Sequence, residues 1–430
     1  MKMNKLTTLI VVAMVLGIFT GYACNTLITD PAAAKEIAGY FSMITDIFLR
    51  LIKMIIAPLV FATLVAGLAG MGDSKTVGRI GARALGWFIA ASSCSLLIGL
   101  TFANLLHPGD ALNVPLPEVG TATSLKVSAL NLKDFITHVF PKSIVEAMAG
   151  NEILQILIFA VFFGLALGNL HNLTARTLVK TMEEIVHVML KVTDYVMRFA
   201  PFGVFAAVAS AITLQGLGIL TVFGKFLGSF YLALAVLWLL IIAAGYFVVG
   251  KDIFRLLSFV RGPMLLGFST ASSESAYPKL MEQLEKFGIK DQVSGFVLPL
   301  GYSFNLDGSM MYTAFAALFV SQAYNIPLSL GEQITMLLVL MVSSKGVAGV
   351  PRSSLVVVAA VLPMFHLPEA GLLLLMGIDH FLDMGRTATN VLGNAVATAV
   401  VAKWEDAVQP VDHSLADDAL PLPGEVAATV

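Results

Sequence analysis

The chain has 430 residues, of which 57% are hydrophobic and 13% are charged, with a mean hydropathy of +0.86. An ordinary soluble domain carries about a quarter charged residues, so this composition excludes one. The net charge is −2 and no long Lys/Arg run occurs, which argues against nucleic acid as a partner. The apolar excess is spread over many segments, each near the roughly 20 residues that cross a bilayer. The composition therefore predicts a multi-pass membrane protein.

Apolar segments along the chain predict eight membrane spans: residues 6–28, 41–71, 77–106, 129–169, 177–212, 218–249, 291–325 and 371–403. Two further apolar segments, 254–285 and 331–366, are interrupted near their middles by Ser, Gly and Pro. Irregular backbone at membrane depth is tolerated only where protein or a water-filled cavity satisfies it. Paired interrupted segments are typical of a transporter's binding centre. We therefore expect two re-entrant helical hairpins, with two kinked helices as the alternative.

Charges in the connections favour this topology and fix its orientation. With Lys2 and Lys5 inside, the basic connections at 75–83, 171–180 and 251–261 also fall in the cytoplasm, as the positive-inside rule requires. Residues 1–403 are predicted to form a single membrane domain, and the polar, acidic residues 404–430 a disordered cytoplasmic tail. The expected location is the plasma (inner) membrane, with cytoplasmic N- and C-termini.

Five polar residues follow one another in the last span at spacings of four, three, four and four: Asp379, Asp383, Arg386, Asn390 and Asn394. These spacings place all five on one face of a helix. Ionisable groups inside a membrane span are costly and usually mark a substrate or ion pathway. The stripe therefore predicts a binding face, with a purely structural Asp383–Arg386 ion pair as the alternative.

A second polar run lies in the seventh span, where Asn305, Asp307 and Gly308 are poor helix formers. We expect this stretch to unwind locally. The freed carbonyls and the Asp307 carboxylate would then suit a small cation or a proton-linked network. The alternative is a helix bent at Gly308, with Asp307 satisfied by its neighbours.

These motifs, together with Gly349-Val-Pro351 and Asp383-Met-Gly-Arg-Thr-Ala-Thr-Asn390, resemble the dicarboxylate/amino acid:cation symporter family, which includes the glutamate transporters. The resemblance covers nearly the whole chain and is closest to the bacterial proton-coupled glutamate/aspartate symporters. It implies an all-α integral membrane protein with the glutamate-transporter-like elevator fold, eight transmembrane helices plus two re-entrant hairpins, assembled as a homotrimer. The scaffold would comprise about 1–71 and 129–212, and the moving transport domain about 77–106 and 218–403.

The resemblance also implies roles for substrate-binding residues. Arg386 would grip the substrate's side-chain carboxylate, Asp383 would pair with its ammonium, and Asn390 would contact its α-carboxylate. Further contacts would come from the hairpin tips and the seventh span, through Ser272, Ser273, Ser309, Gly349, Val350 and Ser354. Because a C4-dicarboxylate offers Asp383 no cation, amino acids are favoured over succinate or fumarate.

Coupling residues depart from the pattern of sodium-using members. Asn394 stands where those members carry Asp, Lys345 could fill a sodium position with its ammonium, and Glu274 could carry a proton at the first hairpin tip. The alternative role for Glu274 is a salt bridge to Lys345 or another cation. The predicted coupling-ion or proton set is completed by Asn305, Asp307 and Asp379.

The resulting prediction is a secondary active symporter, not an enzyme, that takes up glutamate or aspartate with protons and needs no cofactor. Its expected partners are the small-molecule substrate, membrane lipids and further copies of the chain. Sodium-coupled amino acid symport and proton-coupled C4-dicarboxylate symport stay open as alternatives. A channel would need a continuous polar pathway instead of a closed, charge-balanced pocket, which makes it the less favoured class.

Overall fold

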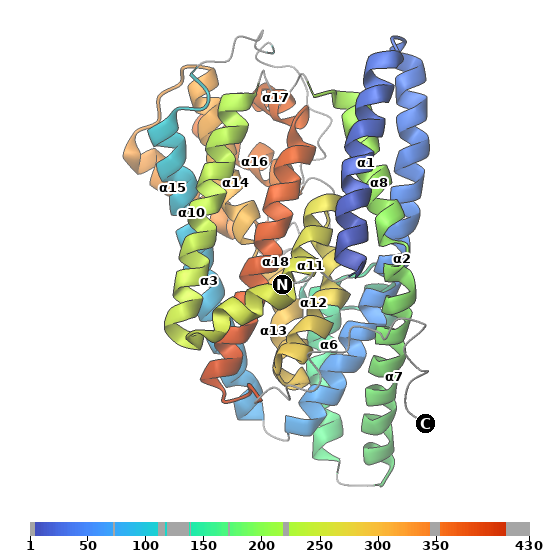
Figure 1. Ribbon diagram of the computed structural model, residues 1–430. Helices are drawn as coiled ribbons and strands as arrows, with labels where there is room; N and C mark the ends of the chain where they lie inside the picture. Colours follow the sequence, from blue (N-terminus) through green and yellow to red (C-terminus); the bar gives the residue numbers. More distant parts are fainter. Residues whose placement is uncertain are drawn as a thin grey trace.

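The computed structural model describes residues 5–71, 74–110, 117, 137, 139–170, 173–217, 223–344 and 353–409 (Figure 1). Every regular element in those ranges is a helix, and β pairing there is limited to one isolated bridge between Ile289 and Val408. The all-α prediction is confirmed for the part of the chain described.

Within the described ranges, four helices are long and apolar enough to cross a bilayer: α1 (Lys5–Leu27), α2 (Pro31–Met71), α3 (Ser74–Leu106) and α10 (Gly224–Val249). A fifth span results if α7 (Leu173–Met197) and α8 (Ala200–Gln215), which meet at a bend of 50°, are counted as one. The helix α6 (Ile153–Asn169) has 17 residues and follows the short α5 (Ile144–Ala149). The total of eight spans stays a prediction, because the other candidates are shorter, interrupted or polar.

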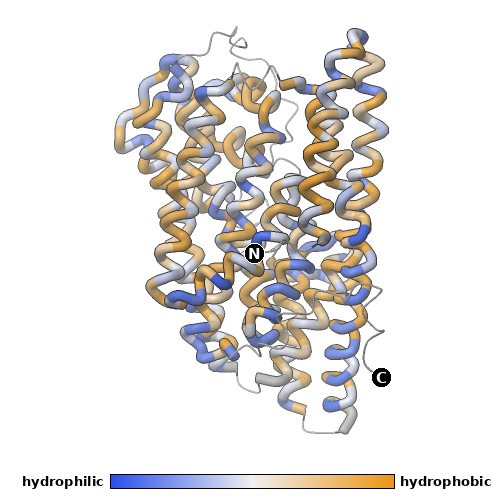
Figure 2. The backbone as a smooth tube through the Cα atoms, in the orientation of Figure 1, coloured by the Kyte–Doolittle hydropathy of each residue, from blue (hydrophilic) through white to orange (hydrophobic). Residues whose placement is uncertain are grey.

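Most residues of α1, α3 and α10 are apolar, as the colours of the backbone in Figure 2 show. Large side chains face outward, including Phe247 of α10, which is 87% exposed, and Phe162 of α6, which is 68% exposed. A soluble protein rarely exposes apolar surface on this scale. The helices are therefore those of a multi-pass membrane protein.

The last two predicted spans are each interrupted. Residues 291–325 form α13 (Asp291–Phe304) and α14 (Asp307–Ala323), separated by Asn305 and Leu306, whose ψ angles of 65° are not helical. This break confirms the local unwinding predicted around Asn305 and Asp307. The final segment divides into the short α17 (Leu372–Met376) and the long α18 (Asp379–Trp404).

Two helix pairs occupy the positions of the predicted hairpins. In the first, α11 (Asp252–Thr270) turns through Ala271 and Ser272 into α12 (Ser273–Phe287), and the two helices pack together. Ala271 makes the reversal possible by adopting the left-handed conformation, with φ of 48°. The second pair is α15 (Leu330–Ser343) and α16 (Ser353–Val361), followed by the 3₁₀ turns η2 (Leu362–Phe365) and η3 (Glu369–Gly371). Its connection, residues 345–352, lies outside the described residues.

The helices pack as two groups, which we call the α2 group and the α18 group (Figure 1). In one, α2 contacts α6, α7 and α8, and α1 lies against α8. In the other, α18 is central and contacts α3, α10, α11, α12, α13 and α14. Contacts of α2 with α12 and α13, and of α8 with α11, join the groups. That the first group is a static scaffold and the second a moving unit stays a prediction.

Residues 404–409, which the sequence analysis assigned to the disordered tail, are packed against the rest of the protein. Glu405 has a nearly buried side chain and forms ion pairs of 2.8 Å with both Arg79 and Arg83 of α3. The Gln409 amide donates to the Gly288 carbonyl at 2.8 Å. The predicted boundary of the tail, at residue 404, was therefore too early, because contacts with distant residues give no local signal in the sequence. Residues 410–430 lie outside the described residues.

Candidate functional site

Arg386 is the centre of the site. It lies on α18, only 1% of its side chain is exposed, and it is the largest of the fully buried side chains. Its guanidinium carbon lies 4.2 Å from the centre of the Tyr312 ring on α14, a cation–π contact. An unpaired guanidinium would be very costly in such a place, so its charge partners decide what the site can bind.

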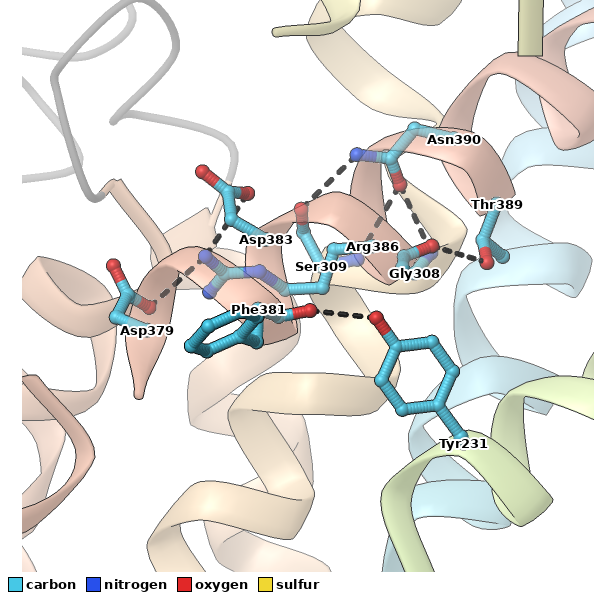
Figure 3. Close-up of polar contacts among 10 residues, drawn as sticks. Tyr231, Gly308, Ser309, Asp379, Phe381, Asp383, Arg386, Thr389 and Asn390 are labelled. Carbon is cyan, nitrogen blue, oxygen red and sulfur yellow. Dashed lines mark hydrogen bonds and ion pairs between the residues drawn. The ribbon is translucent and has the colours of Figure 1, made fainter. Parts of the chain in front are cut away.

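Two carboxylates of α18 converge on one nitrogen of Arg386. Asp379 Oδ1 lies 3.0 Å and Asp383 Oδ1 2.9 Å from Nη2 (Figure 3). The Asp379 side chain is 4% exposed, whereas that of Asp383 is 33% exposed. Asp379 is thus a buried partner of the arginine, and Asp383 is the carboxylate that a ligand can reach.

The other two nitrogens of the guanidinium, Nε and Nη1, are buried and have no hydrogen-bond partner among the described residues. Arginine recognises carboxylates through its N–H donors, and its bidentate pairs are Nε with Nη2 and Nη1 with Nη2. Leaving buried donors unsatisfied costs about 1–3 kcal/mol each, and more for charged groups. Each of these two nitrogens is therefore a donor to which a carboxylate oxygen could bind.

Asn390 connects α18 to the start of α14. Its Oδ1 accepts from the amides of Gly308 at 2.9 Å and Ser309 at 3.3 Å, and its Nδ2 donates to Ser309 Oγ at 3.1 Å (Figure 3). Leu306 occupies the N-cap position of α14 and has no polar side chain, so the cap comes from another helix. The predicted contact of Asn390 with a substrate carboxylate stays untested; the structure gives it this capping role.

A buried polar cluster lies directly beside this cap. Asn305 Nδ2 donates to Asp307 Oδ2 at 3.2 Å and to Asn394 Oδ1 at 3.3 Å, and Ser95 of α3 donates to Asp307 Oδ1 at 3.5 Å. Asn305 Oδ1 is buried without a hydrogen-bond partner among the described residues. Gly393 allows the close approach, since a side chain there would collide with the Asp307 carboxylate. The cluster offers oxygen donors and one carboxylate to a small cation or proton.

The tip of the first hairpin lies near α18. A side chain at Gly267 of α11 would meet Thr387 Cγ2 at 3.0 Å, which places the hairpin beside the residue that follows Arg386. Ser272 caps α12 by accepting from the Ser275 amide at 3.4 Å, and Ser273 is partly exposed. Glu274 forms an ion pair of 3.2 Å with Lys53 of α2. Glu274 thus pairs with a cation, as in the alternative predicted for it, but the cation is Lys53 of α2 and not Lys345 or another residue at the contact of the two hairpins.

The described part of the second hairpin consists of its two helices, without the connection between them. Ser354 lies in the first turn of α16 and is buried. The predicted residues Lys345, Gly349 and Val350 lie outside the described residues. The structure thus brings together the polar stripe of α18, the break between α13 and α14, and the first hairpin tip.

A family model for the sodium:dicarboxylate symporters matches residues 6–404. The chain belongs to this family. It is 40% identical over 412 residues to a C4-dicarboxylate transport protein of Geobacter sp. (strain M21), covering 94% of this chain and 92% of the relative. A second C4-dicarboxylate transport protein, from Acinetobacter baylyi, is 39% identical over 427 residues, which cover 97% of this chain and 94% of that protein.

A third C4-dicarboxylate transport protein, from Laribacter hongkongensis, is 38% identical over 438 residues, covering 98% of this chain and 97% of the relative. The recognised family is thus confirmed. The names of these relatives favour the dicarboxylate alternative over the amino acid uptake that the sequence analysis preferred.

Sequence reasoning missed several residues that position Arg386 in this symporter. Tyr312 stacks on the guanidinium, Tyr231 of α10 donates to the Phe381 carbonyl at 2.6 Å, and Trp238 Nε1 donates to Thr389 Oγ1 at 2.7 Å. Each contact joins α18 to a residue at least 70 positions away in the chain. An aromatic residue in an apolar span carries no local signal of such a role.

Proposed function

We propose that this chain is a cation-coupled symporter of C4-dicarboxylates. The observation that carries the proposal is the pair of buried, unsatisfied donors on Arg386, Nε and Nη1. Each of them suits a carboxylate oxygen of a small dianion. The names of the relatives, all C4-dicarboxylate transport proteins, support this substrate class.

The charge of the site supports coupling to a cation. Among the described residues, one arginine and three carboxylates, Asp307, Asp379 and Asp383, lie on the two facing helices. If all are ionised, the arginine does not balance the carboxylates even before a substrate arrives. A dianion would add two more negative charges, and like charges in a low-dielectric site repel strongly. Cations that enter with the substrate would reduce this repulsion.

The pairing of Asp383 removes the argument against dicarboxylates. That argument held that Asp383 would be left without a cation if the substrate had no ammonium, but Arg386 already supplies one at 2.9 Å. A proton on Asp383 would go further, because a neutral carboxyl can donate a hydrogen bond to a substrate carboxylate. A dicarboxylate that enters with a proton thus fits the same residues.

Uptake of aspartate or glutamate is the second candidate. It is favoured by the 33% exposed side chain of Asp383, which a substrate ammonium could reach. Aspartate shares the four-carbon dicarboxylate skeleton and differs by its amino group. Discrimination between dicarboxylates and acidic amino acids therefore depends on whether the Asp383 carboxylate is protonated or charged.

Protons are the coupling ion that we favour, with sodium as the alternative. Asn394 gives the cluster around Asp307 an amide where a second carboxylate would strengthen a sodium site. Glu274, with 30% of its side chain exposed, can exchange protons with solvent. The family description names sodium, which keeps that ion open.

The architecture in the membrane belongs to the same proposal. We assign eight spans and two re-entrant hairpins, cytoplasmic termini in the inner membrane, a homotrimer, and elevator movement of the α18 group against the α2 group. The grouping of the helices in Figure 1 supports this division.

Uptake by the purified protein in liposomes tests the proposal. Labelled succinate and labelled aspartate are supplied with an inward proton gradient and no sodium, and then with a sodium gradient at equal pH. We expect saturable succinate accumulation driven by the proton gradient. Accumulation of aspartate but not succinate would establish the second candidate, and non-saturable flux of either would indicate a channel.

A further inference from the structure

An ion pair crosses from the α2 group to the tip of the first hairpin. Lys53 Nζ lies 3.2 Å from Glu274 Oε2, with 48% and 30% of the two side chains exposed. Lys53 is on α2, and Glu274 is in the first turn of α12, next to Ser272 and Ser273. Neither the family assignment nor the polar stripe of α18 accounts for Lys53.

The tip is held from its other side by buried aromatic residues. Tyr277 of α12 is fully buried, and its ring lies edge-on to that of Tyr302 of α13, with centroids 5.0 Å apart. The aromatic contact joins two helices of the same group, whereas the Lys53 contact joins the two groups. Only the second must break if the groups move relative to one another.

The ion pair has the strength expected of a reversible contact. Pairs as exposed as this one contribute little to stability, because water screens the charges and both side chains lose freedom. A second contact between α2 and α12 is weak, from Thr63 Oγ1 to Met281 Sδ at 3.8 Å. Lys53 can therefore bias the position of the tip without trapping it.

We propose that Lys53 is a positioning residue of the transport cycle, whose ion pair with Glu274 holds the first hairpin tip against α2 in the state described here. The inference rests on the proposed function for the movement that breaks the pair. Through Glu274 it also sets where Ser272 and Ser273 lie. The residue is specific to one state: once the α18 group moves along α2, Lys53 no longer reaches the tip.

Hydrogen–deuterium exchange in lipid nanodiscs tests the inference without any substrate. The variant Lys53→Met keeps the aliphatic stem and removes the charge, and we expect roughly two- to fivefold faster exchange in peptides that cover residues 266–278. Lys53→Glu should have a larger effect, and Lys53→Glu combined with Glu274→Lys should restore the slow rate. The matched control is Lys286→Glu, which removes an ion pair of 2.8 Å with Glu282 inside α12. Its tip should exchange as in the unsubstituted protein.

Two results would overturn the inference: unchanged exchange at the tip in Lys53→Met, or a double reversal no slower than Lys53→Glu alone. Rescue in the double variant is judged on hydrogen–deuterium exchange and not on substrate uptake, because Glu274 has a coupling role of its own in the proposed function. Uptake of succinate and aspartate by the same preparations is measured in parallel. Failure of the unsubstituted protein to transport either would refute the proposed function while leaving the exchange result intact.

Discussion

Replacing Asp383 by Asn separates the two substrate classes, because the two side chains have the same shape and differ in charge. Asp383 lies 2.9 Å from Arg386 Nη2 and is 33% exposed, while Asp379 keeps a second contact of 3.0 Å with the same nitrogen. The arginine therefore retains a carboxylate partner in Asp383→Asn. What changes is the charge presented to the substrate.

The size of the effect follows from this geometry. An ammonium and a carboxylate about 4 Å apart attract by about 4 kcal/mol at an effective dielectric constant of about 20. Partial exposure of Asp383 reduces this to roughly 2–3 kcal/mol. Aspartate should therefore lose about 30- to 150-fold in affinity. Succinate should bind at least as tightly as before, because the neutral amide in Asp383→Asn repels no carboxylate and can donate a hydrogen bond to one.

Affinities are read from calorimetry with succinate and with aspartate, using Asp252→Asn at the exposed start of α11 as the matched control. A parallel loss of both ligands in Asp383→Asn, with none in the control, would refute the reasoning. It would show that Asp383 holds the Arg386 side chain in position and does not interact with the charge of the substrate.

Three further changes test other parts of the account. Asn390→Ala removes the cap of α14 and should destabilise the protein by about 1–2 kcal/mol, seen as a lower Tm in detergent; an unchanged Tm would mean that the cap is dispensable. Glu405→Gln should cost about 1–2 kcal/mol, since it removes one ion pair from each of two arginines; equal denaturation curves would contradict this. Glu274→Gln should abolish proton-driven accumulation but spare exchange of internal for external substrate, and accumulation at the original level would remove Glu274 from the coupling route.

The parts of the fold that were predictable follow from local chemistry. The spacing of the polar residues in 379–394 identified one face of a helix, and α18 is continuous over that range. Poor helix formers at Asn305 and Asp307 marked a break that the structure places at Asn305 and Leu306. The run of serines after Thr270 marked the tip of the first hairpin. Each is a property of a few neighbouring residues.

The parts that were not predictable depend on which distant residues meet. Asp383 can pair with Arg386 or with the ammonium of a substrate. Which of the two occurs depends on the rotamers of both side chains, and the spacing of the residues along the sequence does not determine these. From the sequence alone, Asn390 could equally have faced the substrate. Its capping contact depends on the break before α14, which leaves backbone amides in need of an acceptor. Lys53 lies more than 200 positions from Glu274, and its apolar surroundings gave no reason to pair them. The ordered residues 404–409 likewise depend on arginines of α3.

The proposed function requires that a carboxylate of the substrate binds to Nε or Nη1 of Arg386. A cryo-electron microscopy structure of the protein with bound succinate tests it most directly. We predict a succinate carboxylate oxygen about 2.7–2.9 Å from Nε or Nη1 of Arg386. Succinate density elsewhere, with those nitrogens still unengaged, would contradict the account.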